Sequence, residues 1–124
     1  MSKEKRTKKV YIAGKIGEDI LSDTTRKKFS DAEAWLKAKG YKVFNPTQSG
    51  LGIIAENYAK ACGTNFYEEI LLLDIMQLKR CDIICLFPDW RESPGALAEY
   101  YFAMAIGKKI KQIAMFGNKI ADWI

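Results

Sequence analysis

The stretch Asp82-Ile83-Ile84-Cys85-Leu86-Phe87 decides the predicted fold. After its first residue it is apolar without interruption, which is typical of a parallel strand that is buried on both faces. A second apolar run, Val10-Tyr11-Ile12-Ala13, is ended by a glycine and predicts another strand of this kind. Such a sheet needs helices on both of its faces, so we expect helical segments between the strands.

The segments around these strands alternate between helical and extended patterns. Phe29, Ala32 and Leu36 follow three- and four-residue spacing and predict a helix over 24–39, capped by Ser22 or Asp23. Other patterns predict helices over 51–61, 66–80 and 94–106, strands over 41–44 and 109–115, a turn at 117–118, and a short docked helix over 119–124. This order predicts an α/β fold: a Rossmann-like or flavodoxin-like three-layer sandwich with four or five parallel strands.

Composition excludes several classes of function. The chain has 124 residues and no histidine, which rules out Ser-His-Asp and Cys-His nucleophiles and histidine-ligated zinc. Its three cysteines show no zinc or redox spacing and are predicted to be buried free thiols. No apolar run reaches membrane-spanning length, and the charged N-terminus is not followed by an apolar stretch, so we expect neither a membrane span nor a secretory leader. We therefore predict a cytoplasmic protein without a metal or cofactor.

The formal net charge of +5 is concentrated at the N-terminus. Residues 1–9 carry five basic residues against one acidic residue, which leaves the remaining 115 residues nearly neutral. We predict a flexible basic tail over 1–9 and a single domain over 10–124. Because the domain shows no basic stripe, nucleic acid is not expected as a partner.

The carboxyl ends of parallel strands meet at one edge of a sheet, and this edge is where such folds bind ligands. Gly14-Lys15-Ile16-Gly17 follows the first strand, and Ser93-Pro94-Gly95 opens a helix after the strand over 82–87. Glycines allow a phosphate to approach the backbone, and a helix N-terminus offers free amides. An ordinary strand-to-helix turn is the alternative for the first segment. Weaker candidates for base or sugar contacts at the same edge are Asn45, Gln48, Asp89 and Trp90.

Two carboxylates stand among apolar neighbours. Asp74 lies within the segment 71–76, and Glu99 lies in the helix predicted over 94–106. Burying a carboxylate costs free energy unless it is paired, and the alternative is that each one faces water on its helix. If both face the crevice, this histidine-free chain has the pair that glycosidic-bond cleavage uses, a nucleophile and a proton donor.

The ordered set of these motifs resembles the nucleoside 2-deoxyribosyltransferase-like superfamily, and especially its small bacterial and phage members. The matching stretches are Tyr11 to Ile16, Gly40 to Pro46, Asp74-Ile75, and Pro88 to Glu99. Members of this superfamily cleave the N-glycosidic bond of deoxynucleosides or their 5′-monophosphates through a glutamate that attacks C1′. The chain is also similar to the 2′-deoxynucleoside 5′-phosphate N-hydrolases of that superfamily.

The resemblance implies roles for individual residues. Glu99 would be the nucleophile, Asp74 would assist proton transfer at the leaving base, and Tyr11 would orient the glutamate or the sugar. The 5′ end would be held by Gly14, Lys15, Ile16, Gly17, Ser93, Pro94 and Gly95. Ser93 and Lys15 favour a phosphorylated substrate.

The resemblance also implies a homodimer or larger homo-oligomer, because family members complete their site across a subunit interface. Asn118 would be a contributor from the neighbouring subunit. The chain also carries a segment, Leu51 to Cys62, that is inserted relative to the family, and Tyr58 within it and Phe66 after it would cap the base. Gly17 stands where the hydrolases carry an arginine, which leaves a second hypothesis open. The first hypothesis is an N-glycosidase of (deoxy)nucleoside 5′-monophosphates or deoxynucleosides, acting as hydrolase or 2-deoxyribosyltransferase. The second is a non-catalytic nucleotide-binding or sensor module of the same fold.

Overall fold

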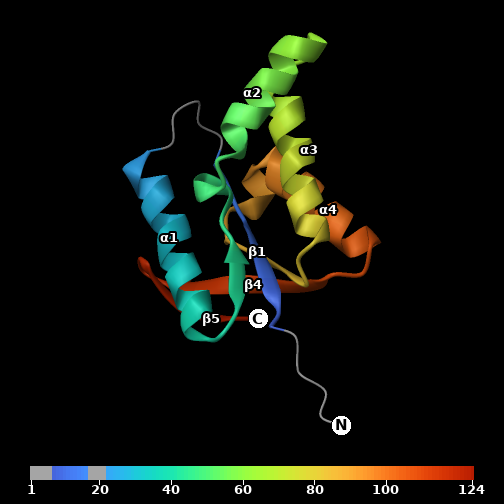
Figure 1. Ribbon diagram of the computed structural model, residues 1–124. Helices are drawn as coiled ribbons and strands as arrows, with labels where there is room; N and C mark the ends of the chain where they lie inside the picture. Colours follow the sequence, from blue (N-terminus) through green and yellow to red (C-terminus); the bar gives the residue numbers. More distant parts are fainter. Residues whose placement is uncertain (1–6, 17–21) are drawn as a thin grey trace.

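The computed structural model describes residues 7–16 and 22–124. The predicted tail therefore lies largely outside the described residues, as does the predicted phosphate contact Gly17. The division into a tail over 1–9 and a domain over 10–124 stays a prediction, with the first strand beginning at Lys9. The elements, shown in Figure 1, are β1 (Lys9–Ala13), α1 (Asp23–Ala38), β2 (Lys42–Phe44), the 3-10 helix η1 (Pro46–Gln48), α2 (Leu51–Cys62), α3 (Phe66–Lys79), β3 (Ile83–Leu86), the 3-10 helix η2 (Trp90–Glu92), α4 (Pro94–Ala105), β4 (Lys109–Phe116) and β5 (Lys119–Trp123).

The five strands form one sheet in the order β2-β1-β3-β4-β5. β1 pairs in parallel with β2 and β3, and β3 pairs in parallel with β4, whereas β5 is antiparallel to β4. The predicted α/β sandwich is confirmed, and its sheet is mostly parallel. The two apolar runs that decided the prediction, β1 and β3, are the neighbouring central strands.

The prediction of a C-terminal helix over 119–124 is wrong, because this segment forms β5. The register of the β4–β5 pair shifts between Ala114 and Met115, so Ala114 pairs with Asp122 and Met115 pairs with Ile120. This irregularity leaves Ala121 as an extra residue in β5. Ile120 and Trp123 consequently both pack against the core beneath α1 although they are three residues apart. A three-residue spacing produced by a bulge resembles the spacing of a helix face.

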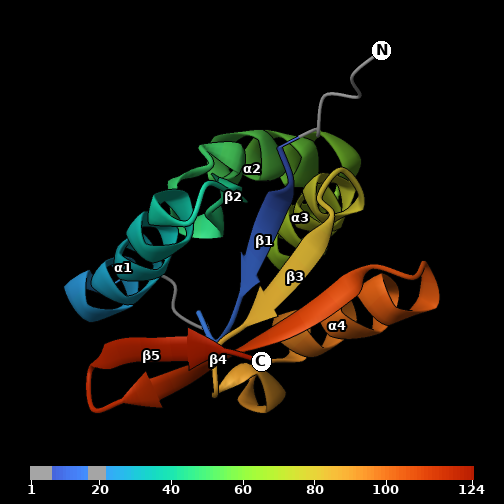
Figure 2. The same cartoon turned by 90° about the horizontal axis from the view of Figure 1, so that it is seen from below.

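The sheet is covered on both faces, and α1 and α4 lie on opposite sides of the central strands (Figure 2). Alternate residues of β1 contribute to two separate cores. Val10 and Ile12 pack with Phe29 on the α1 side, whereas Tyr11 and Ala13 pack with residues of α3 and α4 on the other side. The sequence prediction of helices on both faces is confirmed.

Side-chain caps set the starts of three helices, and each start agrees with the prediction to within one residue. The side chain of Ser22 accepts a hydrogen bond from the backbone N–H of Thr25, that of Asn65 from Glu68, and that of Ser93 from Ala96. Each cap satisfies an N–H that the first turn of a helix leaves unpaired. Ser93 therefore fixes the point where α4 begins at the carboxyl end of β3.

The cysteines divide into two groups. Cys81 and Cys85 are buried free thiols, as predicted, but Cys62 is exposed at the end of α2, so the prediction of three buried thiols is wrong at this position. Cys62 lies in the last turn of α2. Its apolar neighbours in the sequence suggested burial, but they do not show which face of α2 packs against the rest of the protein. Within residues 7–16 and 22–124, no helix is both long enough and apolar enough to cross a membrane.

Candidate functional site

A cavity of about 370 Å³ opens where the parallel strands end. Gly14 and Ile16 reach it from the end of β1, Thr47 from the segment after β2, and Ser93 from the segment after β3. This is the edge of the sheet at which α/β folds bind ligands, as the sequence predicted. The lining residues are Gly14, Ile16, Pro46, Thr47, Ser49, Gly50, Gly52, Ile53, Phe66, Tyr67, Ile70, Leu71, Asp74, Ser93, Gly95, Ala96 and Glu99.

A tyrosine–glutamate pair lies beside the cavity, which Glu99 borders and the fully buried Tyr11 does not. The Tyr11 side chain points from β1 toward α4, and its hydroxyl donates a hydrogen bond to the carboxylate of Glu99. Tyr11 is fully buried and its ring stacks on that of Phe44, with 5.2 Å between ring centroids. Glu99 is 7% exposed and borders the cavity. The glutamate is therefore buried, paired with a neutral hydroxyl, and open to a ligand.

Burial controls the charge of this pair. It raises the pKa of Glu99 from 4.5 to about 8, a shift that the hydrogen bond from Tyr11 opposes and the nearby charge of Asp74 reinforces. The pKa of Tyr11 is raised well above 10 by burial, with the charges of Glu99 and Asp74 adding to the effect. Tyr11 thus keeps its proton at neutral pH and stays a hydrogen-bond donor to Glu99.

Asp74 is the second carboxylate of the cavity. It borders the cavity from α3, and burial raises the pKa of its carboxyl from 3.8 to about 7. Its Oδ1 atom is buried and has no hydrogen-bond partner among the described residues. Buried polar atoms in folded proteins nearly always have a partner, so this oxygen is available to a donor that enters the cavity. The alternative in which the carboxylate faces water is wrong for Glu99, whereas Asp74 is half-buried at the cavity with one buried oxygen.

The start of α4 supplies backbone groups to the same cavity. Ser93 and Gly95 border it, and Ser93 is buried. The Ser93 Oγ accepts from Ala96 N at 3.2 Å, and the Ser93 carbonyl accepts from Leu97 N at 2.9 Å. The N–H groups of Ala96 and Leu97 are thus used by Ser93, and Pro94 has no N–H. The other N–H group in the first turn of α4 is that of Gly95. Pro94 itself is exposed and does not border the cavity.

Apolar side chains from α2 and α3 form the outer wall of the cavity. Ile53, Phe66 and Tyr67 border it, and all three are substantially exposed. Phe66 was expected near a base, and it borders the cavity, whereas Tyr58 does not and is 52% exposed. The lining residues absent from the sequence prediction, such as Thr47, Ser49 and Ile70, carry no motif. Only the fold places them there.

The other predicted site residues do not border the cavity. Asn45 is buried and donates to Glu33, Gln48 donates to Ser30, and Trp90 is buried beside Tyr100. Asn118 borders a separate hollow of about 290 Å³ between α1 and the β4–β5 hairpin.

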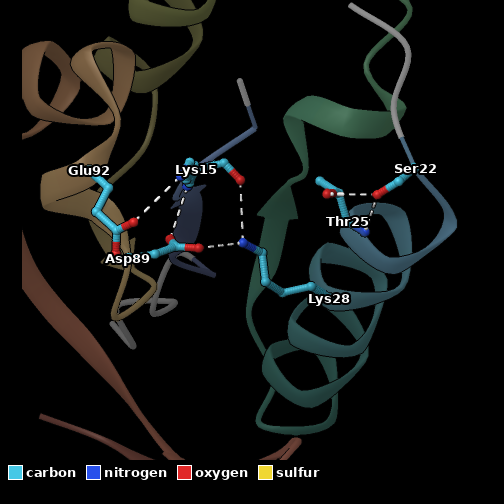
Figure 3. A network of polar contacts seen from close by, with 6 residues as sticks. All are labelled: Lys15, Ser22, Thr25, Lys28, Asp89 and Glu92. Carbon is cyan, nitrogen blue, oxygen red and sulfur yellow. Dashed lines mark hydrogen bonds and ion pairs between the residues drawn. The ribbon is translucent and has the colours of Figure 1, made fainter. Parts of the chain in front are cut away.

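Lys15 and Asp89 belong to a polar network beside the cavity (Figure 3). The Nζ of Lys15 lies 3.4 Å from a carboxylate oxygen of Glu92, and Asp89 is paired with Lys28. Lys15 thus pairs with a carboxylate instead of pointing at the cavity. Among residues 7–16 and 22–124 there is also no group of three His, Cys, Asp or Glu side chains arranged to hold a metal ion.

The fold and the cavity define an α/β domain whose cavity at the strand ends presents one buried carboxylate, Glu99, and one half-buried carboxylate, Asp74. The chain belongs to the family described as a domain of unknown function, DUF4406, whose model matches residues 8–112. No curated protein matches it in sequence. A solved structure similar to this chain is the CMP N-glycosidase BcmB of Clostridium botulinum, with 25% sequence identity and a TM-score of 0.49. The similarity covers 83% of this chain but just under two thirds of that enzyme, 66%.

Proposed function

We propose that this protein cleaves the N-glycosidic bond of (deoxy)nucleoside 5′-monophosphates or deoxynucleosides, as a hydrolase or as a 2-deoxyribosyltransferase. One observation carries the proposal: the buried Glu99 accepts a hydrogen bond from Tyr11 while bordering a cavity that also contains Asp74. The motif resemblance to the nucleoside 2-deoxyribosyltransferase-like superfamily supports the same assignment. These three residues are also the ones that the motifs of that superfamily single out.

In the proposed reaction Glu99 is the nucleophile. Its ionised carboxylate attacks C1′ of the sugar, the bond between C1′ and the base nitrogen breaks, and a glycosyl-enzyme ester forms. Asp74, whose carboxyl keeps its proton up to about pH 7, donates this proton to the departing base. The ionised Asp74 then takes a proton from a water molecule, or from the nitrogen of a second base in a transferase, as that molecule attacks C1′ and breaks the ester bond, which releases the Glu99 carboxylate.

Tyr11 acts on the ionisation of the nucleophile. Burial favours the protonated form of Glu99, and the Tyr11 hydroxyl opposes this by stabilising the carboxylate. An oxocarbenium-like transition state places positive charge beside Glu99 and further favours its ionised form. The two carboxyls titrate as a coupled pair, and the reactive form has an ionised Glu99 and a protonated Asp74.

The apolar wall suits the base, and the glycine-rich side suits the sugar. Phe66 and Tyr67 offer aromatic faces on which a planar base can stack. Gly14, Ser93 and Gly95 present backbone close to the opposite side of the cavity. We assign the 5′ end of the substrate to this side.

We also propose that the protein acts as a homodimer or larger homo-oligomer. The outer face of α3 exposes Leu72 (59%) and Met76 (53%), which are one helical turn apart, and the adjacent α4 exposes Tyr101 (57%). Clusters of exposed apolar side chains are typical of association surfaces. The cross-subunit role of Asn118 remains a prediction.

The test is base release from a panel of nucleosides and nucleoside 5′-monophosphates, measured by chromatography for the wild type, Glu99→Gln and Glu56→Gln. Glu56 is an exposed glutamate of α2 that pairs with Lys60, so its variant is the matched control. We expect the wild type and Glu56→Gln to release base and Glu99→Gln to lose activity by about a thousandfold or more.

Two other outcomes contradict the proposal in different ways. If no compound is cleaved but nucleotides raise the Tm of the wild type and Glu99→Gln equally, the protein is a binding or sensor module. If Glu99→Gln retains turnover, the nucleophile is a different residue.

A further inference from the structure

Asp89 and Lys28, which do not border the cavity, form a second structural unit at the strand ends. One oxygen of the Asp89 carboxylate, Oδ1, accepts from the backbone N–H of Lys15 at 3.0 Å, and Oδ2 accepts from Lys28 Nζ at 2.8 Å. The same Lys28 Nζ lies 3.3 Å from the backbone carbonyl of Lys15 and donates to it. Three segments distant in sequence, namely the end of β1, the end of β3 and α1, therefore meet at one carboxylate (Figure 3).

This ion pair is more protected than an ordinary surface pair. The side chains of Lys28 and Asp89 are 26% and 30% exposed, whereas those of the Lys27–Asp31 pair on the same helix are 74% and 52% exposed. The Nζ of Lys28 also lies 4.9 Å from the ring centroid of Phe87 and 5.4 Å from that of Phe29. An ammonium held over two rings beside a carboxylate is restricted in position.

The backbone packing at this point leaves little freedom. A Cβ atom added to Gly14 would lie 2.7 Å from Cδ2 of Phe87 and 3.2 Å from Oδ1 of Asp89. The end of β1 therefore touches the end of β3 with no room for a side chain, and Phe87 N donates to Ala13 O at 2.9 Å. Asp89 therefore lies in close contact with the end of β1 as well as with its own segment.

The two segments joined by Asp89 carry the two partners of the buried pair. Tyr11 is on β1, three residues before Gly14. Asp89 is followed by η2, whose C-cap is Ser93, and Ser93 starts α4, which carries Glu99. Gly14 and Ile16 on one segment and Ser93 and Gly95 on the other also supply facing parts of the cavity wall.

We propose that Asp89 and Lys28 are positioning residues that form a clamp. The clamp holds α4 against β1, so that the Glu99 carboxylate keeps its hydrogen bond with Tyr11 and its position beside the bound sugar. The kinetic part of this inference rests on the proposed glycosidase function, while the structural part does not. Neither residue touches the substrate cavity, so the clamp acts through the segments it joins. A misplacement of about 1 Å at a reacting group can cost about a hundredfold in rate, which sets the scale of the expected effect.

The test compares Lys28→Met, Lys28→Arg, Asp89→Asn and the matched control Lys27→Met, which removes only the exposed pair on the same helix. For the released base we expect kcat to fall about 10- to 100-fold in Lys28→Met and Asp89→Asn, with KM changed less. Lys28→Arg should recover most of the rate, and Lys27→Met should match the wild type. Equal kcat in Lys28→Met and the wild type, or a loss in Lys27→Met of the same size, would overturn the proposal.

A second measurement does not need turnover. Glu99 is titrated by NMR with carboxyl-labelled glutamate in the wild type, Lys28→Met and Lys27→Met. If the clamp keeps Glu99 buried, its pKa falls toward the ordinary value in Lys28→Met, although the loss of a positive charge would by itself act in the opposite direction. An unchanged or raised pKa of Glu99 in that variant contradicts the clamp. A wild type that cleaves nothing contradicts only the proposed function, and the titration still decides the clamp.

Discussion

The two faces of the sheet are built from the same strands but differ in what they bury. On the α1 face, alternate residues of β1 meet Phe29, Leu36 and Phe87 in a core made of apolar side chains. On the opposite face, the intervening residues of β1 meet α3 and α4, and there the buried groups include Tyr11 and Glu99 beside an open cavity. Both faces bury apolar side chains, but the face under α3 and α4 also loses stability because it keeps the Glu99 carboxylate out of water.

The largest expected effect is on the α1 face of the sheet. Phe29 is fully buried, and its ring meets that of Phe87 edge to face with 5.0 Å between centroids. Phe29→Ala should lower the free energy of unfolding by about 3–5 kcal/mol because it leaves a cavity. Ile70→Ala, on the partly exposed wall of the open face, should lower it by less than about 1.5 kcal/mol. Urea unfolding of both variants measures this difference, and equal losses would contradict the comparison.

The second prediction concerns the cost of burying Glu99. Its pKa is raised from 4.5 to about 8, so the folded protein binds a proton that the unfolded chain releases between these pH values. The free energy of unfolding of the wild type therefore falls as the pH rises through this window, by up to about 1.4 kcal/mol per pH unit from this group. Glu99→Gln removes this contribution.

We accordingly expect Glu99→Gln to be as stable as the wild type near pH 4 and more stable by about 2–4 kcal/mol near pH 8.5. Urea unfolding across this pH range checks the prediction. Asp74 contributes with the same sign in both proteins, so the difference between them isolates Glu99. A stability difference that does not change with pH would contradict the burial of an ionisable Glu99.

The smallest expected effect separates the two members of the buried pair. The Tyr11 hydroxyl lowers the pKa of Glu99, so Tyr11→Phe should raise that pKa by roughly one pH unit, the scale of a hydrogen bond to a charged group. Because Asp74 titrates below Glu99, the form with ionised Glu99 and protonated Asp74 is a minor species. Tyr11→Phe should therefore lower the maximum of the kcat/KM profile by up to about tenfold and move its basic limb upward by about one pH unit. Tyr101→Phe, which alters an exposed tyrosine of α4, is the control. A basic limb and a maximum that both stay in place in Tyr11→Phe would show that the hydroxyl does not act on Glu99.

The central strands and helices could be predicted from the sequence because each is marked by a pattern within its own residues. The continuous apolar character of β3 and the Ser93 cap of α4 identify their elements without tertiary information. β5 was misassigned because a bulge places Ile120 and Trp123 on one side at a helical spacing, and a bulge depends on the pairing with β4.

The candidate site was also predictable only in part. Asp74 and Glu99 could be recognised as carboxylates in apolar surroundings, and their meeting at one cavity followed from the parallel topology. Thr47 and Ile70 could not be recognised, because ordinary side chains become lining residues only through the packing of α2 and α3. Lys15 was expected to face a phosphate, but its pairing with Glu92 depends on the conformation of η2.

The exposed end of α2 carries a thiol that can be labelled chemically. Burial raises the pKa of the Cys81 thiol to about 11 and that of the Cys85 thiol to about 12, which keeps both protonated and shielded at neutral pH. Cys62 alone is exposed. A maleimide dye should therefore attach at one defined position without any engineered mutation, on the helix that carries Gly52 and Ile53 of the cavity wall. The native chain thus already contains a fluorescent reporter site for ligand binding.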